Sequence, residues 1–232
     1  MPPNVSLGAI KTIQLLYPEQ KIQVVKLHEG ENLPNIKDTN AIIISGGEFG
    51  VYDAFGPNKK PEYNWVREQE VPFIETAIKA DLPILGICFG HQLLGHMYGG
   101  EVKYRPDLSE IGCFTIALTT NGQKSSFFNK VSNQFIAWLY HNDHIITLPN
   151  GAVVLANSER TQFQALKLSD KVFGVQFHPE MWGEVSAFFY TRTRSYLEKL
   201  GYNIDELTDD TANISTKDIF MIIKNFFNLI ED

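Results

Sequence analysis

The chain has 232 residues, 44% of them hydrophobic, with a formal net charge of −7; this length fits one α/β domain, alone or with a small appendage. The acidic balance and the lack of a basic run argue against nucleic acid or an anionic membrane surface as a partner. No signal peptide and no apolar run near the ~20 residues that span a bilayer are recognisable, and two cysteines make no disulfide framework, so we expect a cytoplasmic protein.

Strands and helices alternate along the first hundred residues. Apolar residues at helical spacing predict helices, and continuous apolar or β-branched runs predict strands. Such alternation is typical of a doubly wound sheet with helices on both faces. We expect helices at residues 6–17, 62–80 and 89–98, and strands at residues 22–27, 41–45 and 83–87.

Shorter alternating segments in the second half predict a small antiparallel extension beside the main sheet. The predicted fold class is α/β, with a doubly wound, mostly parallel sheet flanked by helices and a helical C-terminal tail. We predict a domain over residues 1–182 and a helical extension over residues 183–232. The expected elements are strands at 113–119, 134–140, 153–157, 163–168 and 172–177, then helices at 185–200 and 217–229 around a polar loop near 209–210.

The segment G-I-C-F-G at residues 86–90 follows a predicted strand and opens a predicted helix. A sharp turn of this kind lifts the thiol of Cys88 out of the core toward solvent, and Gly86 and Gly90 stand where a side chain would crowd the bend. The adjacent helix N-terminus favours the thiolate, which is the reactive form. Cysteine is often buried and inert, but the flanking glycines favour a nucleophile here. Cys113 has no such setting and is expected to be structural.

A partner for this thiol lies far downstream, in the segment G-V-Q-F-H-P-E at residues 174–180. A predicted strand delivers His178 at its C-terminal end, and Glu180 follows two positions later. A cysteine nucleophile needs a general base, and that base needs a third group to orient it. We therefore expect His178 and Glu180 to fill these two roles, although each alone could be an ordinary polar residue at a strand end.

These two segments, with A-I-I-I-S-G-G at residues 41–47, resemble the triad type of the class I glutamine amidotransferase family. Each of the three motifs ends a predicted strand, and ligand sites of open α/β sheets lie at the carboxyl ends of strands. The resemblance covers about residues 5–182 and implies a flavodoxin-like sheet. The turn at Cys88 and the Gly-Gly segment are similar both to the amidotransferase unit of GMP synthetases and to stand-alone γ-glutamyl peptidases.

The resemblance implies a role for further residues near the thiol. The backbone N–H groups of Gly47 and Phe89 are expected to form an oxyanion hole, in which each donor typically contributes about 10²–10³ in rate. The cluster H-N-D-H at residues 141–144 could be a metal site, but no further ligand group accompanies it, so we expect no metal. Contacts to substrate are expected from Gly46, Gln92, Gly112, His141 and Asp143.

The implied reaction is hydrolysis of the side-chain amide of glutamine, or of a γ-glutamyl bond, through a thioester on Cys88 with release of ammonia. No cofactor is required. The chain contains no segment like a synthetase or a nucleotide-binding loop, so we expect either a separate synthetase subunit that uses the ammonia or a stand-alone γ-glutamyl hydrolase. The sequence also leaves a homodimer open.

Two other functions compete with this interpretation. In a cysteine-type α/β-hydrolase the acid would precede the histidine, and Asp143 or Asp170 would then serve. A degenerate family member could instead be a binding or regulatory module without catalysis. The presence of Cys88, His178 and Glu180 argues against that second alternative.

The start of the chain departs from the family pattern. Family members usually begin with a strand inside the sheet, whereas this sequence opens with M-P-P-N at residues 1–4 and enters a helix almost at once. A missing interior strand would leave backbone groups of its neighbours unpaired. We expect either a start further upstream or compensation by the C-terminal helices or a partner chain.

Overall fold

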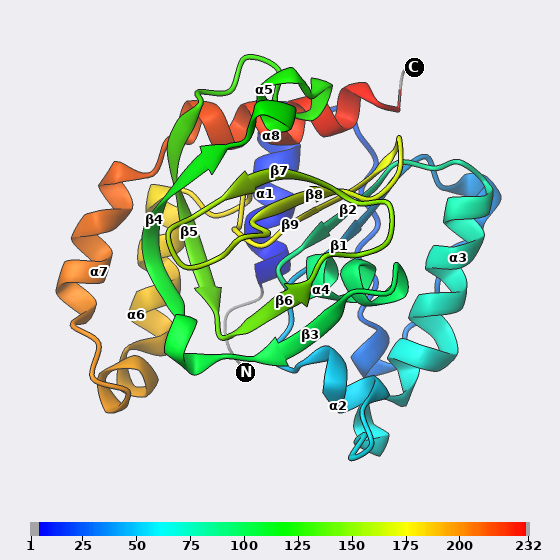
Figure 1. Cartoon of the computed structure of the whole chain (residues 1–232), viewed down its shortest axis with the longest axis horizontal. Coiled ribbons are helices and arrows are strands. Elements are labelled where there is room, and N and C mark those ends of the chain that lie inside the picture. The colour runs from blue at the N-terminus through cyan, green and yellow to red at the C-terminus, as the bar shows by residue number, and fades with distance from the viewer. Residues whose placement is uncertain (1–4, 231–232) are drawn as a thin grey trace.

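The structure is a computed structural model that describes residues 5–230, and it has a curled seven-stranded sheet with helices on both faces (Figure 1). The strand order is β1-β2-β9-β8-β7-β4-β5, and β3 and β6 pair separately. The strands are β1 Ile42–Ile44, β2 Ile84–Ile87, β3 Glu101–Tyr104, β4 Glu110–Leu118, β5 Gln134–His141, β6 Asp143–Thr147, β7 Val153–Asn157, β8 Ala165–Lys167 and β9 Val172–Val175.

The helices alternate with the strands in the first half of the chain and gather at its C-terminal end. The helix predicted at residues 62–80 is divided into a short 3₁₀ turn, a π-helical segment at Val66–Glu70 and α3. The α-helices are α1 Val5–Leu16, α2 Val51–Phe55, α3 Val71–Lys79, α4 Phe89–Met97, α5 Thr120–Lys124, α6 Gly183–Lys199, α7 Ile204–Asp210 and α8 Thr216–Asn228.

The sheet is mixed, and the predicted α/β class is confirmed. Strands β1, β2 and β9 are parallel, whereas β9, β8, β7, β4 and β5 pair antiparallel in that order. The antiparallel part is thus larger than the small extension that we expected. Short links such as the one from β8 to β9 require antiparallel pairing, because a parallel pair needs a crossover of a dozen or more residues.

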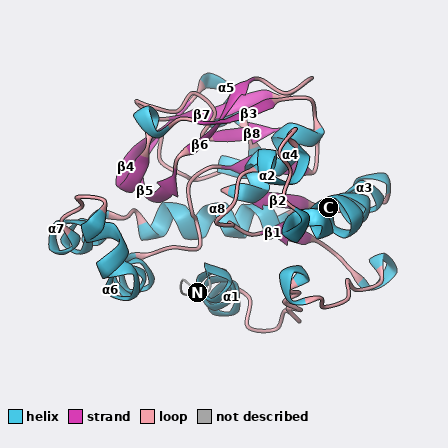
Figure 2. Ribbon diagram, turned by 90° about the horizontal axis from the view of Figure 1, so that it is seen from below, coloured by secondary structure: helices cyan, strands magenta, loops and turns pink. Residues whose placement is uncertain are grey.

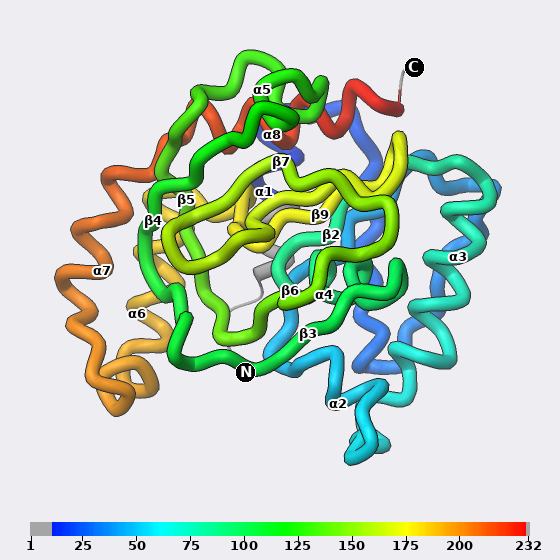
Figure 3. The backbone as a smooth tube through the Cα atoms, viewed as in Figure 1, coloured from blue at the N-terminus to red at the C-terminus, as the bar shows by residue number. Residues whose placement is uncertain are grey.

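The parallel strands are the ones that position the predicted motifs. Figure 3 follows β1 and β2 from the first half of the chain and β9 from its last third as they run side by side. The register pairs Gly86 of β2 with Ile44 of β1 on one side and with Gly174 of β9 on the other. The carboxyl ends of the three strands therefore meet at one edge of the sheet.

Strand β2 separates two layers of the core because its side chains alternate between faces. Leu85 and Ile87 pack in a cluster with Ile13 of α1 and Ile222 of α8. Ile84 packs in a second cluster, which includes residues of α3 and α4. The helices thus cover both faces of the parallel strands, as the edge-on view in Figure 2 also shows.

A third cluster holds the C-terminal helices against the antiparallel end of the sheet. It contains Trp138 of β5, Phe189 and Tyr190 of α6 and Ile204 of α7. Helix α8 takes part in both clusters, with Ile219 in this one and Ile222 in the main core. The helical C-terminal region is therefore confirmed, while the division of the chain at residue 182 stays a prediction. Within residues 5–230, no helix is long and apolar enough to cross a bilayer.

Several sequence expectations were wrong. The segment 22–27 forms no strand, and its last residue begins a short 3₁₀ turn at Leu27–Glu29, so β1 is the edge strand of the described sheet. Strands β3 and β6 were not predicted, and the polar loop expected near residues 209–210 is the end of α7. In the described part of the chain no strand precedes α1, and residues 1–4, where the unusual start was noted, lie outside the described residues.

Candidate active site

Cys88 stands at the sharp turn between β2 and α4. Its backbone has φ 53° and ψ −104°, an unusual conformation for a residue with a side chain. Backbone strain of this kind persists where the surroundings over-determine it, and it concentrates at functional sites. Contrary to the expected exposure to solvent, the residue is only 6% exposed, and its Sγ lies 3.9 Å from the carbonyl oxygen of Tyr140.

The two glycines beside Cys88 are required by close backbone packing. A Cβ on Gly86 would lie 2.4 Å from the carbonyl oxygen of Gly90, and a Cβ on Gly90 would lie 2.4 Å from the carbonyl oxygen of Ile44. Real Cβ atoms do not approach backbone oxygens this closely. The glycines therefore let α4 sit tightly on β1 and β2, and this packing holds the turn in its strained form.

His178 and Glu180 form a buried pair just beyond β9. The Nδ1–H of His178 donates to Oε1 of Glu180 at 2.8 Å, and the two side chains are 3% and 1% exposed. The backbone is held too: the N–H of His178 donates to the carbonyl oxygen of Trp138, and the hydroxyl of Thr12 donates to that of Glu180. The carboxylate thus fixes the ring with Nε2 directed away from it.

Cys88 and His178 meet beside the glycines that follow β1. A Cβ added to Gly46 would lie 3.1 Å from Cε1 of His178 and 3.9 Å from Sγ of Cys88. Burial on its own lowers the pKa of His178, but the charge of Glu180, the charge of Cys88 and hydrogen bonds to both outweigh it and raise the pKa to about 10. An imidazole in this setting is held as a cation that can pair with a thiolate.

The predicted oxyanion donors lie next to each other. A Cβ on Gly47 would lie 3.4 Å from Cγ of Phe89, and the ring of Phe49 packs on that of Phe89 with centroids 4.4 Å apart. Among residues 5–230, neither the N–H of Gly47 nor that of Phe89 has an acceptor. Phe89 is the first residue of α4, where backbone N–H groups have no partner within the helix. The role of Gly47 and Phe89 as an oxyanion hole stays a prediction.

Three of the five residues expected to touch substrate, Gln92, His141 and Asp143, are joined by hydrogen bonds. The Nε2 of Gln92 donates to the carbonyl oxygen of Asp143 at 3.0 Å and to Oε1 of Gln176 at 3.1 Å. Nδ1 of His141 binds the same carbonyl oxygen, and the carboxylate of Asp143 accepts from the hydroxyl of Tyr52 at 2.9 Å. The structure thus brings together residues from α2, α4, the β5–β6 turn and the segment that follows β9.

Gly112 lies further along β4, opposite Leu139 of β5. Its φ is +128°, and a Cβ there would lie 3.1 Å from a methyl group of Leu207 on α7. Glycine is therefore favoured by the backbone conformation and by the approach of α7.

Sequence reasoning did not single out Thr12, Gln176 or the buried hydrogen bonds of the Glu110 side chain. Gln176 stands two residues before His178 in the same motif, so its alternate position on the strand was a usable signal. The partners of the Glu110 side chain had no such signal, because they come from β5 and from the segment 158–164.

The acids of the competing hydrolase model are placed elsewhere. Asp170 is 95% exposed and pairs with Lys167 before β9 begins, whereas His178 follows the end of that strand. The carboxylate of Asp143 is bound by Tyr52, and only Glu180 binds His178 among the described acids. Within residues 5–230, no three His, Cys, Asp or Glu side chains are arranged to hold a metal ion.

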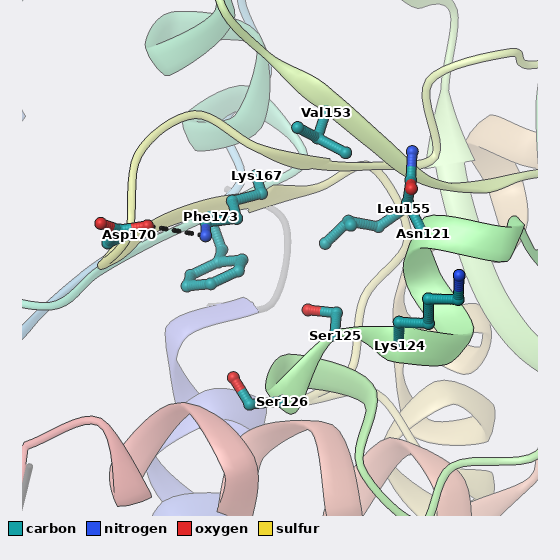
Figure 4. Close-up of a pocket in the computed structure, with 9 residues that line it drawn as sticks. All are labelled: Asn121, Lys124, Ser125, Ser126, Val153, Leu155, Lys167, Asp170 and Phe173. Carbon is teal, nitrogen blue, oxygen red and sulfur yellow. Dashed lines mark hydrogen bonds and ion pairs between the residues drawn. The ribbon is translucent and has the colours of Figure 1, made fainter.

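A hollow of about 430 Å³ lies away from these residues, at the other end of β9. Figure 4 shows Ser125 and Ser126 on one side of it and the Lys167–Asp170 ion pair on the other, with Phe173 and Leu155 between them. It includes none of the residues around the thiol, so we do not place the reaction there.

The comparisons with known proteins agree with the geometry. Residues 13–190 match the family model described as glutamine amidotransferase class-I. One subunit of the glutamine-hydrolysing GMP synthase of Methanocaldococcus jannaschii is 35% identical over 152 residues, which cover 65% of this chain and 70% of that protein. The glutamine-hydrolysing GMP synthase of Helicobacter pylori is 36% identical over 155 residues, and the match covers 65% of this chain but only 26% of that longer protein.

Solved structures share the fold over almost the whole chain. A glutamine amidotransferase from Thermotoga maritima superimposes with a TM-score of 0.82 at 22% identity, covering 100% of this chain and 96% of that one. A second, from Methylobacillus flagellatus, gives 0.77 at 20% identity, covering 96% and 89%. From the family match over residues 13–190, this chain belongs to the class I glutamine amidotransferase family.

Proposed function

We propose that this protein hydrolyses the side-chain amide of glutamine, with Cys88 as nucleophile, His178 as general acid and base, and Glu180 as the group that orients His178. One observation carries the proposal: an unusually strained cysteine between two obligatory glycines stands beside an imidazole that is itself held by a buried carboxylate. Family membership supports it, because the three segments are the ones that the resemblance assigns to catalysis.

The reaction proceeds in two halves. The thiolate of Cys88 forms a bond to the amide carbon, and the displaced electron pair moves onto the carbonyl oxygen, where the N–H groups of Gly47 and Phe89 stabilise it. The imidazolium of His178 gives its proton to the leaving nitrogen, the carbon–nitrogen bond breaks and ammonia departs. A water molecule then loses a proton to His178 and attacks the thioester, so the carbon–sulfur bond breaks and the thiolate–imidazolium pair is restored; the released carboxylic acid ionises in solvent to give glutamate.

We assign the remaining predicted residues to the substrate side of the site. Gly46 would face the glutamyl chain, because it borders both Cys88 and His178. The amide nitrogen of Gln92 and the ring of His141 already bind the carbonyl oxygen of Asp143. They would therefore shape the substrate side of the site rather than bind substrate themselves. Gly112 would contact substrate through its backbone groups only.

The ammonia acceptor is proposed to be a separate synthetase subunit. The M. jannaschii relative is named as one subunit of a GMP synthase, and the match to the H. pylori enzyme covers about a quarter of that chain. Both facts fit a glutaminase unit that works with a second unit. Stand-alone γ-glutamyl hydrolysis, which the sequence also left open, is the second candidate.

The test is release of glutamate by the purified chain from glutamine and from γ-glutamyl peptides. We expect activity that is lost in Cys88→Ala and kept in Cys113→Ala. Cys113 is the matched control because burial, and to a smaller degree the charge of Asp210, raises the pKa of its thiol to about 12. Activity on peptides but not on glutamine would favour the stand-alone hydrolase, and a Cys88→Ala variant as active as the parent would overturn the proposal.

A further inference from the structure

We propose that Glu110 is a positioning residue of this site: its buried carboxylate, paired with the His141 ring, holds the β5–β6 turn against the helix that carries Cys88. The inference rests on the proposed function and extends it to residues that do not touch the reacting atoms. It is built from a continuous set of hydrogen bonds that runs from β4 to the segment after β9.

The carboxylate of Glu110 is fully buried and unusually well bound. One oxygen accepts from the hydroxyl of Ser158 at 2.6 Å. The other accepts from Nε2 of His141 at 3.0 Å, from the hydroxyl of Thr161 at 2.6 Å and from Nε2 of Gln164 at 2.7 Å. Burial opposes ionisation, but these hydrogen bonds and the charge of His141 together lower the pKa of Glu110. The group is therefore an anion at neutral pH.

His141 must carry a proton on both ring nitrogens. Its Nε2 faces the ionised Glu110, and its Nδ1 lies 3.1 Å from the carbonyl oxygen of Asp143. A carboxylate and a carbonyl oxygen can only accept, so both nitrogens must donate. Glu110 and His141 thus form a buried ion pair, and removing the anion would leave the imidazolium uncompensated.

Two further hydrogen bonds link the ion pair to α4, the helix that follows Cys88. The carbonyl oxygen of Asp143, which His141 binds, also accepts from Gln92 on α4, one turn after Cys88. Gln92 in turn donates to Gln176, two residues before His178. A single path of hydrogen bonds therefore joins Glu110 to the segments that carry both reacting side chains.

A second branch ties Glu110 to the segment between β7 and β8. The hydroxyl of Thr161 gives its proton to Glu110, so it can only accept from Nδ1 of His144 at 3.1 Å. Ser158 accepts from the backbone N–H of Thr161 and from Gln164. The carboxylate of Glu110 thus joins β4 to β5 and to the segment 158–164. Buried ion pairs are weak contributors to net stability, and what this one supplies is a defined position for the β5–β6 turn.

The test is Glu110→Gln, which keeps the shape of the side chain and removes its charge. Alkylation of Cys88 is measured with two reagents: iodoacetamide, which needs no recognition, and 6-diazo-5-oxo-norleucine, an analogue of glutamine. We expect kcat/KM for glutamine and the labelling rate with the analogue to fall roughly 10- to 100-fold, as for a small misplacement of groups near the chemistry. Labelling with iodoacetamide should stay within about threefold of the parent.

Two controls separate positioning from loss of fold. Glu101→Gln is the same substitution at a half-exposed position of β3 and should change neither rate. Asn225→Ala, which removes the hydrogen bonds that α8 donates to the carbonyl oxygens of Phe127 and Asn129, should lower the melting temperature without changing the ratio of the two labelling rates. If Glu110→Gln does not fold, Thr161→Val removes one bond of the carboxylate and should shift the same ratio several-fold.

The outcomes distinguish the two proposals. A parent protein that the analogue does not label contradicts the proposed function itself. A labelled parent combined with equal slowing of both reagents in Glu110→Gln, or with no slowing of either, overturns the positioning role alone.

Discussion

At the residue scale, the turn at Cys88 is held by packing rather than by its own preference. A non-glycine residue in a sparsely populated backbone region costs on the order of 1–3 kcal/mol. The approach of Gly90 to the carbonyl oxygen of Ile44 and of Gly86 to that of Gly90 leaves the chain no other path. The strain is thus stored in the nucleophile, and the glycines maintain it.

Gly90→Ala should test this packing. The new methyl group would meet the carbonyl oxygen of Ile44, so we expect a loss of about 1–3 kcal/mol in the free energy of unfolding together with a loss of activity. Gly183→Ala is the matched control, because a Cβ there meets nothing closer than 3.7 Å and alanine suits the start of α6. Urea unfolding of both variants checks the prediction; equal stabilities would contradict it.

Glu180→Gln should lower the pKa of His178. In the parent, Glu180 and Cys88 raise this pKa to about 10 from an ordinary 6.5, so the pair stabilises the fold fully below pH 6.5 and loses that contribution as pH rises through 10. With the neutral amide, the loss of stability across this window should shrink. NMR titration of the ring and unfolding at several pH values measure both effects, and an unchanged ring pKa would show that Glu180 does not charge His178.

The site could be predicted from the sequence only where its residues are neighbours in the chain. The turn at Cys88 and the pair His178 and Glu180 each lie within one short motif, and both were expected. The bonds of Glu110 reach from residue 110 to residue 164. Local spacing carries no signal for such a cluster, because its members come together only when the sheet has formed.

At the element scale, the C-terminal helices are fastened to the sheet by a buried polar contact. The indole N–H of Trp138 on β5 donates to the hydroxyl of Tyr190 on α6 at 2.6 Å, inside an otherwise apolar cluster. The same β5 residue accepts from the backbone N–H of His178. Docking of α6 is therefore coupled to the strand that supports the general base.

Tyr190→Phe should destabilise the protein by about 1–3 kcal/mol, because it leaves the indole N–H of Trp138 buried without an acceptor. Tyr196→Phe, on the same helix but 57% exposed, should change stability by less than about 0.5 kcal/mol. Chemical denaturation of the two variants measures the difference. If the two variants lose equal free energy of unfolding, the hydrogen bond between Tyr190 and Trp138 does not stabilise the protein.

The π-helical segment before α3 contains a buried carboxyl group, that of Glu70. Burial raises the pKa of Glu70 to about 7, and one of its oxygens is buried without a partner among the described residues. Ionisation of this group in the folded state therefore costs free energy. Its contribution to stability is most favourable below pH 4.5, the ordinary value, and declines as pH rises through 7.

Glu70→Gln should remove this decline. We expect the variant to exceed the parent by about 1–3 kcal/mol at pH 8.5 and to approach it below pH 4.5. Glu68→Gln on the same segment is exposed and should leave stability unchanged at both pH values. Guanidinium titrations at pH 4.5 and 8.5 supply the comparison, and a pH-independent gain would rule out the burial of Glu70 as its source.

Elements with a strong pattern were predicted and those set by their neighbours were not. The continuous apolar run of β2 and the spacing of apolar residues in α4 were sufficient on their own to predict these two elements. The segment 22–27 has the composition of a strand but forms no ladder with a strand of the described residues. Strands β3 and β6 are defined by each other, since Glu101 pairs with Thr147 across an intervening 45 residues.

At the scale of the whole molecule, the site results from the direction of three strands. Because β1, β2 and β9 are parallel, the glycines after β1, Cys88 after β2 and His178 after β9 all emerge at one edge. This part of the fold follows from the alternation of strands and helices. The antiparallel order of β8, β7, β4 and β5 does not, because short strands of similar composition pair equally well in several orders.

The central claim is that Cys88 carries the glutamyl group during turnover. The most direct measurement is to incubate the protein with glutamine, quench it in acid and identify by mass spectrometry the cysteine that holds a γ-glutamyl thioester. We predict the adduct on Cys88 alone, with more of it in His178→Ala if attack still occurs there. An adduct on Cys113, or glutamate release from the parent with no adduct at Cys88 under conditions that trap thioesters, would contradict this claim.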